Sequence, residues 1–334
     1  MLFHHGKNFE LHHGDCEGVL AGLPERSVNC CVTSPPYWKL RKYEGGGEEI
    51  GWEPTPEAYI ASLVRAFRAL RRVLRDDGVA WLNLGDCFAS KACGSRKRKD
   101  LVGIPWAAAF ALRDDGWHLR SEVVWAKGVS GQRELTAQVR RHAADLGVAP
   151  EVVEQLAERL EPFIGSGMPE SCRDRPSRSH EHIFMLAKSP RYAYDDDAVR
   201  EPYSPMTIAT TQRKRMIAEG KFSAETEFRG NHTGKVGGTG ERMLKLNPKG
   251  RNRRSVWTIP ARPFKGAHFA TFSPELVEPC VLAGCPSGGT VVDIFNGSGT
   301  VGEVALKQGR RYIGIDLNRE YLAMSRGRLA PLDA

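Results

Sequence analysis

Two stretches of the chain carry residues that could do chemistry, and the first is Thr33-Ser34-Pro35-Pro36-Tyr37-Trp38. It follows the apolar run 27–32, which predicts a buried strand. The prolines must end that strand, because proline cannot donate to a β-ladder and restricts the residue before it. The resulting stiff turn offers a hydroxyl, carbonyl acceptors and two aromatic faces, so it could hold a flat, hydrogen-bonding substrate such as a nucleobase. On these residues alone, a proline-stiffened loop with two core aromatics is the alternative.

The second stretch, residues 289–316, has the pattern of strand, glycine-rich turn, helix and strand. The first strand runs into Asn296-Gly297-Ser298-Gly299-Thr300, and the second ends in Asp316. This order is typical of a nucleoside-binding βαβ unit, in which glycines let the ligand approach the backbone and the final acid binds ribose hydroxyls. Asp293 lies beside the turn, where an acid suits an ammonium group and would repel a pyrophosphate.

The segment Gly297–Gly302 also satisfies the G-x-G-x-x-G pattern, so a dinucleotide-binding enzyme of the NAD type is an alternative. Only 18 residues follow Asp316, which are too few to add the further strands of such a domain. Those strands exist only upstream. We therefore expect a permuted order, in which the 289–316 unit joins a sheet begun by the N-terminal half.

The turn Ser34-Pro35-Pro36-Tyr37 resembles the catalytic motif of the DNA amino-methyltransferases, which methylate the exocyclic amine of cytosine or adenine. The stretch 293–300 resembles their S-adenosylmethionine motif, and 267–276 resembles their helix over the methionine end of the cofactor. A catalytic motif first, a recognition region next and a cofactor motif last is the order of the β group of these enzymes. The resemblance covers nearly the whole chain, and an insert at 129–165, whose role the sequence does not indicate, is the main departure.

This resemblance implies S-adenosylmethionine as cofactor and duplex DNA as substrate, with the target base flipped out of the helix. Ser34 and the carbonyl of Pro35 or Pro36 would then bind the target amine, and Tyr37 would stack on the base. Asp15 is either a contact near the adenine end of the cofactor or the N-cap of the helix after it. The residues implied to bind the cofactor are Asp293, Phe295, Asn296, Gly297, Ser298, Gly299, Thr300, Asp316, Asp15, His268 and Phe272.

Serine at the first position of the catalytic motif usually accompanies cytosine in this family, so the resemblance favours methylation of the cytosine 4-amino group. Methylation of the adenine 6-amino group by the same fold and mechanism is the alternative. An RNA or protein methyltransferase with the same motifs is more distant. A DNA-binding module without catalysis is disfavoured, because both motifs are intact.

The elements around these motifs predict an α/β fold: a Rossmann-like methyltransferase sheet, circularly permuted, with an antiparallel terminal hairpin and an inserted recognition region. We expect strands 9–15 and 27–32 to be parallel neighbours joined by a helix, with Asp15 and Ser34 at their carboxyl ends. Two or three helices are expected within 133–161. Five segments follow: 1–128 as the N-terminal half of the catalytic domain, 129–180 as an insert with a polar loop, 181–200 as a closing strand, 201–256 as the recognition region, and 257–334 as the cofactor-binding half.

Positive charge is concentrated rather than spread over the chain. Residues 211–254 hold twelve basic residues against four acids, an excess equal to the net charge of +8 for the whole chain. Such a segment predicts contact with a polyanion, although a solvated or disordered loop is the alternative. A second basic run follows the strand 78–86 directly. The residues expected to touch DNA are Arg96, Lys97, Arg98, Lys99, Arg213, Lys214, Arg215, Arg251, Arg253 and Arg254.

Composition excludes several classes of protein. The hydrophobic content of 41% and charged content of 26% are ordinary for a soluble globular protein, and no apolar run is long enough to span a membrane. The first residues do not resemble a signal peptide, so we expect a cytoplasmic protein of bacterial, archaeal or phage origin. Cys87 and Cys93, near His118, lack the spacing of a zinc site, so no metal is expected. A monomer or homodimer, with or without a partner restriction endonuclease, fits the chain.

Overall fold

The computed structural model describes residues 1–40, 49–127 and 172–218, then 246–260 and 273–333, with six further positions between 143 and 155. The chain divides into two compact units. Unit 1 comprises Met1–Tyr194 with Ser255–Ala334, and unit 2 comprises Asp195–Arg254. The expected helices of the 129–165 insert lie outside the described residues, apart from those six positions.

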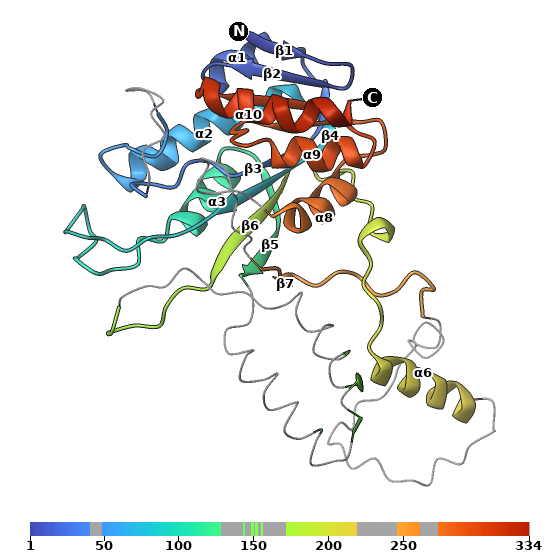
Figure 1. Cartoon of the computed structure of the whole chain (residues 1–334). Coiled ribbons are helices and arrows are strands. Elements are labelled where there is room, and N and C mark those ends of the chain that lie inside the picture. Colours follow the sequence, from blue (N-terminus) through green and yellow to red (C-terminus); the bar gives the residue numbers. More distant parts are fainter. Residues whose placement is uncertain are drawn as a thin grey trace. The chain divides into compact units, whose positions relative to one another are not determined.

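Unit 1 is built on one sheet, and in the described residues it has nine strands in the order β1-β2-β9-β8-β3-β4-β6-β5-β7 (Figure 1). Strands β2, β9, β8, β3 and β4 are parallel, and β6 runs antiparallel between β4 and β5. The sheet therefore has the predicted antiparallel terminal hairpin. The bounds are β1 Leu2–His5, β2 Phe9–His13, β3 Val28–Thr33, β4 Leu74–Leu84, β5 His118–Ala126, β6 His180–Ala187, β7 Val256–Thr258, β8 Thr290–Asp293 and β9 Arg311–Asp316.

Helices cover both faces of this sheet (Figure 1). Alternate residues of a strand point to opposite faces. Cys31 of β3 accordingly joins the core beneath α2, while Val32 and Leu276 of α8 line the same small cavity. Strands enclosed in this way are buried nearly throughout, as β3 and β8 are. The helices of unit 1 are α1 Cys16–Gly22, α2 Pro56–Val73, α3 Ile104–Asp114, α8 Pro274–Gly284, α9 Thr300–Lys307 and α10 Arg319–Leu329, with a final turn η3 Ala330–Leu332.

Two expectations about the sheet were wrong in detail. Strands β2 and β3 are parallel and joined by α1, but they are not neighbours, because β9 and β8 lie between them. The C-terminal βαβ unit thus inserts into the middle of the sheet rather than adding to its edge. Strand β4 begins at Leu74, directly after α2, and not at Gly78. The short edge strand β7 had no signal in the sequence.

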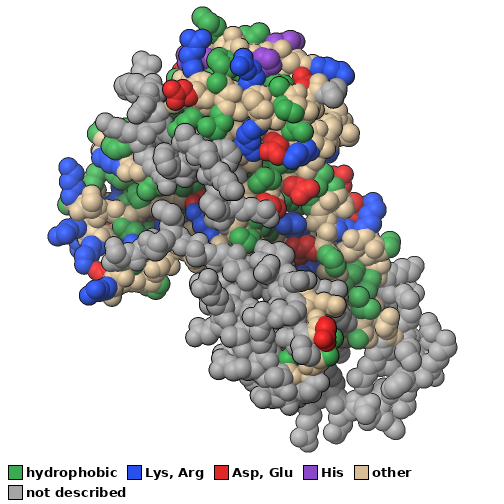
Figure 2. Space-filling model, in the orientation of Figure 1, with side chains coloured by type: hydrophobic (Ala, Val, Ile, Leu, Met, Phe, Trp, Pro, Cys, Tyr) green, Lys and Arg blue, Asp and Glu red, His purple; other side chains and the backbone are tan. Residues whose placement is uncertain are grey.

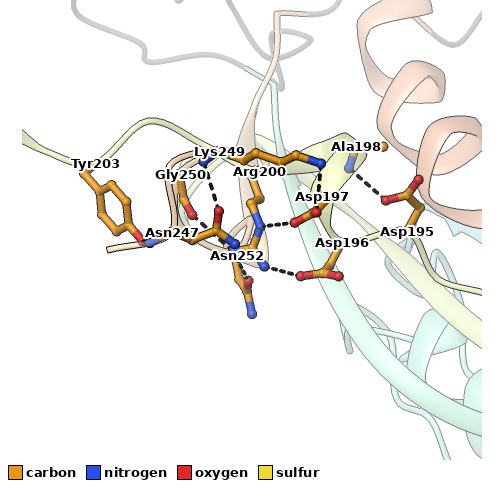
Figure 3. A network of polar contacts seen from close by, with 10 residues as sticks. All are labelled: Asp195, Asp196, Asp197, Ala198, Arg200, Tyr203, Asn247, Lys249, Gly250 and Asn252. Carbon is orange, nitrogen blue, oxygen red and sulfur yellow. Dashed lines mark hydrogen bonds and ion pairs between the residues drawn. The ribbon is translucent and has the colours of Figure 1, made fainter. Parts of the chain in front are cut away.

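Unit 2 contains η2 Asp197–Val199 and α6 Pro205–Ala218, and its two described chain segments are tied together (Figure 3). Glu201 and Arg251 exchange backbone hydrogen bonds at 2.9 and 2.8 Å. The Arg200 guanidinium contacts the carboxylates of Asp196 and Asp197 and donates to the Gly250 carbonyl at 3.1 Å. The hydrogen bond from Arg200 lowers the pKa of Asp197 to about 2, with help from a second bond from Lys249. These contacts hold the chain just before the basic segment 211–254 against the chain near the end of that segment.

Candidate active site

The two chemical motifs meet at the carboxyl edge of the sheet. Strands β3 and β8 are parallel neighbours, so the turn after β3 lies beside the end of β8. The Thr33 hydroxyl donates to Asp293 Oδ1 at 2.6 Å, which joins the residue before Ser34 to the end of β8, 260 positions away and just before the glycine-rich turn. Asp316 ends β9, the next strand along. The structure thus brings Ser34, Asp293 and Asp316 to one edge.

Asp293 is only 2% exposed, and its two carboxylate oxygens differ. Oδ1 accepts from the Thr33 hydroxyl and from the Phe295 backbone N–H at 3.0 Å. Among the described residues, nothing donates to Oδ2. Burial raises the pKa of Asp293 to about 7, against the lowering effect of those two hydrogen bonds. An acid enclosed in this way with one oxygen left over suits a cationic ligand.

Asp316 holds the glycine-rich turn and the start of α10. Its Oδ2 accepts from the Gly297 N–H at 2.7 Å, and its Oδ1 accepts from the Asn318 N–H at 2.8 Å. Desolvation raises the pKa of Asp316 to about 6, and these backbone bonds oppose the shift. Each oxygen can accept once more. A pair of ribose hydroxyls would complete this arrangement.

Three of the residues expected to bind the cofactor turn their side chains into the protein. Asn296 Oδ1 accepts from the Tyr312 hydroxyl at 2.8 Å, and Arg328 donates to Ser298 Oγ at 3.0 Å and to Thr300 Oγ1 at 3.2 Å. Only the backbone of these three residues is available to a ligand. Gly299 has φ +78°, and a Cβ there would lie 2.2 Å from Ser325 Oγ, so close packing against α10 requires glycine.

The turn that bears Ser34 and Tyr37 is held in place by contacts from neighbouring elements. The Tyr59 hydroxyl of α2 donates to the Pro36 carbonyl at 2.9 Å, so this carbonyl of the turn already has a donor. Trp38 is a core residue, and its Nε1 donates to the Glu53 carbonyl at 3.0 Å. The alternative interpretation of the turn expected a core position for both aromatics, and for Trp38 it is correct. Tyr37 is partly exposed, as is Ser34. The turn therefore offers Ser34 and Tyr37 to a ligand.

Sequence reasoning missed three polar residues behind this turn. Asn83 Nδ2 donates to the Tyr37 hydroxyl at 2.7 Å and to Glu181 Oε2 at 2.8 Å. The Tyr37 hydroxyl donates to the same Glu181 oxygen at 2.5 Å, and Lys127 forms an ion pair with the other. No motif marks these three residues. Asn83 and Glu181 are buried polar residues in strands, at the end of β4 and the start of β6, and the sequence alone does not show that burial.

Other predicted site residues have clear local roles or lie outside the description. Asp15 is the N-cap of α1 and accepts from the Gly18 N–H at 2.9 Å, while β2 before it pairs with β9 and so ends level with Asp316. His268 and Phe272 lie outside the described residues. No group of three or more potential metal ligands occurs in the part of the chain that the structure describes.

The basic residues predicted to touch DNA fall into two groups. Arg96 pairs with Glu57 and Lys99 with Asp174, whereas Lys97 and Arg98 are exposed without such partners among the described residues. Figure 2 shows Lys and Arg side chains gathered over this loop, on the left of the view. In unit 2, Arg251 pairs with Glu201, and Arg253 and Arg254 follow it. Arg213, Lys214 and Arg215 belong to α6, but their side chains lie outside the description.

Comparisons with known proteins agree with this geometry. A sequence profile of the DNA methylase family of N6 and N4 methyltransferases matches residues 28–326. The type II methyltransferase M.XycI of Xanthomonas campestris pv. cyanopsidis is 39% identical over 340 residues, which cover 96% of this chain and 87% of that protein. M.Cfr9I of Citrobacter freundii is 38% identical over the same length, with the same coverage.

Solved structures show the same fold. The PvuII DNA methyltransferase, described as cytosine-N4-specific, superposes with a TM-score of 0.54 and 15% identity, covering 98% of this chain and 92% of that one. The protein TTHA0409 of Thermus thermophilus, crystallised with S-adenosyl-L-methionine, superposes with a TM-score of 0.54 and 21% identity, covering 98% and 96%. The sheet is therefore that of a DNA methyltransferase. Among the described residues, no helix is long and apolar enough to cross a membrane.

Proposed function

The chain belongs to the DNA methylase family of N6 and N4 methyltransferases, and from that premise we propose that it methylates the exocyclic 4-amino group of cytosine in duplex DNA. S-Adenosylmethionine is the methyl donor. The observation that carries the proposal is the contact between the Thr33 hydroxyl and Asp293, because it joins the turn bearing Ser34 to the cofactor turn. A methyl group on a cofactor bound at the glycine-rich turn would face an amine bound at the turn that bears Ser34.

Direct transfer needs alignment above all, because the methyl group on a sulfonium is already activated. Asp293 Oδ2 would bind the methionine ammonium, and Asp316 would bind the ribose hydroxyls. Ser34 Oγ and the Pro35 carbonyl would accept hydrogen bonds from the flipped amine. Those bonds draw the amine toward tetrahedral geometry and free its lone pair for attack. Tyr37 would stack on the base.

Cytosine is favoured over adenine because serine at the first position of this motif usually accompanies cytosine in the family, and because a structural relative is described as cytosine-N4-specific. The adenine 6-amino group is the alternative, with the same residues in the same roles. The order of the motifs along the chain supports membership of the β group. The type II relatives support a role beside a cognate restriction endonuclease.

One experiment tests the base and the substrate together. DNA from a methylation-deficient host expressing the protein is sequenced with modified-base detection, and its digested nucleosides are analysed by mass spectrometry. We expect 4-methylamino cytosine at one short sequence, and none with empty vector. Methylated adenine alone would replace the cytosine proposal, and unmodified DNA beside methylated RNA would replace the DNA substrate.

Binding of S-adenosylmethionine is expected to weaken roughly 10-fold as pH falls from 8 to 6. The pKa of Asp293 is about 7 and that of Asp316 about 6, so both acids take up protons over this range, and a protonated Asp293 no longer attracts an ammonium. Calorimetry at constant ionic strength measures the dependence. 5′-Methylthioadenosine, which lacks the ammonium, should show a smaller one, and an affinity constant across this range would contradict the role of Asp293.

Charge reversal at Arg253 and Arg254 is expected to weaken DNA binding and to lower the slope of log affinity against log salt by about 2. Both residues lie in the basic segment of unit 2, which we propose as the recognition region. Fluorescence anisotropy over a salt series measures the slope. Arg326→Glu on the exposed side of α10 is a control with the same change of charge per site. An unchanged slope would mean that the two arginines do not contact phosphate.

A further inference from the structure

Five polar side chains meet behind the catalytic turn: Ser34, Tyr37, Asn83, Lys127 and Glu181. They come from the turn itself, from β4, from the residue after β5, and from β6. The ion pair between Lys127 and Glu181 is largely enclosed, with side-chain exposures of 21% and 12%. Enclosed charges need compensating partners. Here the compensating hydrogen bonds form a chain that runs from the ion pair to Ser34.

The carboxylate of Glu181 fixes the direction of these hydrogen bonds. An ionised carboxylate can only accept hydrogen bonds. The Tyr37 hydroxyl therefore donates its single hydrogen to Glu181 Oε2, 2.5 Å away. Burial, followed by the charge of Glu181, raises the pKa of Tyr37 well above its ordinary value, so the hydroxyl keeps that proton. Tyr37 Oη can then only accept from its other neighbours. These are Asn83 Nδ2 at 2.7 Å and Ser34 Oγ at 3.5 Å.

Ser34 is the last member of this chain of hydrogen bonds. A serine hydroxyl has one proton to donate and two lone pairs to accept with. Its proton is directed at Tyr37 Oη. Asn83 Nδ2 is also 3.5 Å from Ser34 Oγ, but the two amide hydrogens have closer acceptors in Tyr37 and Glu181. In this arrangement the Ser34 proton is turned toward Tyr37 Oη, and a lone pair of Ser34 Oγ is left for a ligand.

The orientation of Asn83 supports the same polarity. Its Oδ1 is buried and has no hydrogen-bond partner among the described residues, which is a costly arrangement for a carbonyl oxygen. Turning the amide over would place that oxygen against the Glu181 carboxylate and the Tyr37 lone pairs. In the observed orientation Asn83 Oδ1 has no partner among the described residues, and both amide hydrogens of Asn83 point into the cluster.

We propose that Glu181, held by Lys127 and acting through Tyr37, makes Ser34 a hydrogen-bond acceptor toward the target base. The site then accepts an amino group, which donates, and rejects the carbonyl oxygen that uracil or thymine carries at the same position, which only accepts. Glu181, Lys127 and Asn83 are positioning residues in this scheme. The inference rests on the proposed amino-methyltransferase function and adds the residues that set its selectivity.

Glu181→Gln tests the proposal with little change of shape. A glutamine amide can donate to Tyr37 Oη, which frees the tyrosine proton for Ser34 and reverses the chain. We expect the single-turnover methylation rate to fall roughly 10- to 100-fold while the Kd for S-adenosylmethionine stays within about 2-fold. Tyr37→Phe should also slow the reaction. Because Glu181 acts through Tyr37, the double variant should be no slower than Tyr37→Phe alone.

A second measurement tests whether Ser34 accepts or donates a hydrogen bond toward the target base. Duplexes carrying the sequence found by modified-base detection are prepared with cytosine or uracil at the target position, and each Kd is measured with S-adenosylhomocysteine present. Relative to wild type, Glu181→Gln should shift the ratio of the two Kd values toward uracil by roughly 10-fold. Glu122→Gln is the matched control, since Glu122 lies on neighbouring β5 and pairs with His182 at 2.5 Å. It should leave the ratio and the rate unchanged.

The outcomes separate the possibilities. A slower Glu181→Gln enzyme with an unchanged ratio would overturn the proposal, as would a double variant much slower than Tyr37→Phe. Parallel losses of melting temperature and of both affinities, without a change of ratio, would mark Glu181 as a structural residue only. If wild type methylates adenine, the cytosine assignment fails but the inference survives, and it is then tested with adenine and hypoxanthine.

Discussion

Asp293→Asn is expected to weaken S-adenosylmethionine binding roughly 100-fold, because it removes one partner of an enclosed charge pair. The substitution is conservative in shape. Thr33 Oγ1 and the Phe295 N–H both donate to Oδ1, so an asparagine oxygen can keep both bonds. The change then falls on Oδ2, which becomes an NH₂ group and meets the ligand's ammonium as a donor.

The same substitution is expected to raise the melting temperature of the free protein at pH 8. Burial raises the pKa of Asp293 to about 7, above its value in the unfolded chain. An acid shifted in this direction favours the folded state fully below its unfolded pKa of about 4, and that contribution is lost as pH rises through about 7. Asparagine cannot ionise, so it avoids the cost at pH 8, and the difference between the two proteins should shrink at pH 5.

Calorimetry and thermal melts at both pH values measure these opposite effects. Asp86→Asn is the matched control: Asp86 follows β4 and caps α3 by accepting from the Ile104 N–H at 3.0 Å. It should leave cofactor affinity near that of wild type. Unchanged affinity in Asp293→Asn would remove Asp293 from the cofactor site, and a lower melting temperature at pH 8 would contradict the buried-charge argument.

The parts of the fold that the sequence predicted are those governed by local rules. Prolines after β3, glycines after β8 and an acid as the last residue of β9 mark strand ends, and each end was placed within a few residues. Sheet order was harder, because it depends on which distant strands pair. The expectation that β2 and β3 are neighbours used the usual adjacency of consecutive strands. It failed because β8 and β9, which come last in the sequence, pair between them.

The candidate site divides in the same way. Ser34, Asp293 and Asp316 stand in short motifs whose chemistry is visible in the sequence. Lys127 and Glu181 do not, because their pairing depends on the register between the end of β5 and the start of β6. A charge buried in a strand, as Glu181 is, requires a partner, but the sequence does not say which one. The sequence predicted the residues that we propose to touch the substrate, and it missed those that we propose to orient them.

Ser34→Ala is expected to lower the rate of methyl transfer by roughly 100-fold or more, with little change in cofactor affinity. The hydrogen bond from the target amine to Ser34 Oγ strengthens only as the amine becomes tetrahedral, so its loss raises the barrier more than it weakens binding. Single-turnover kinetics with saturating cofactor measures the rate. Ser27→Ala is the control, since Ser27 precedes β3 and donates only to the Pro24 carbonyl at 2.7 Å among the described residues.

The product of the slow variant carries further information. In the proposed site Ser34 would supply one acceptor and the Pro35 carbonyl the second, so alanine at position 34 would leave the amine held on one side only. Residual product should still be 4-methylamino cytosine, because the pocket and the flipped base are unchanged, and mass spectrometry of nucleosides tests this directly. A full rate in Ser34→Ala would mean that the backbone carbonyl alone activates the amine. A rate loss matched by an equal loss of DNA affinity would place Ser34 in ground-state recognition instead of in the chemical step.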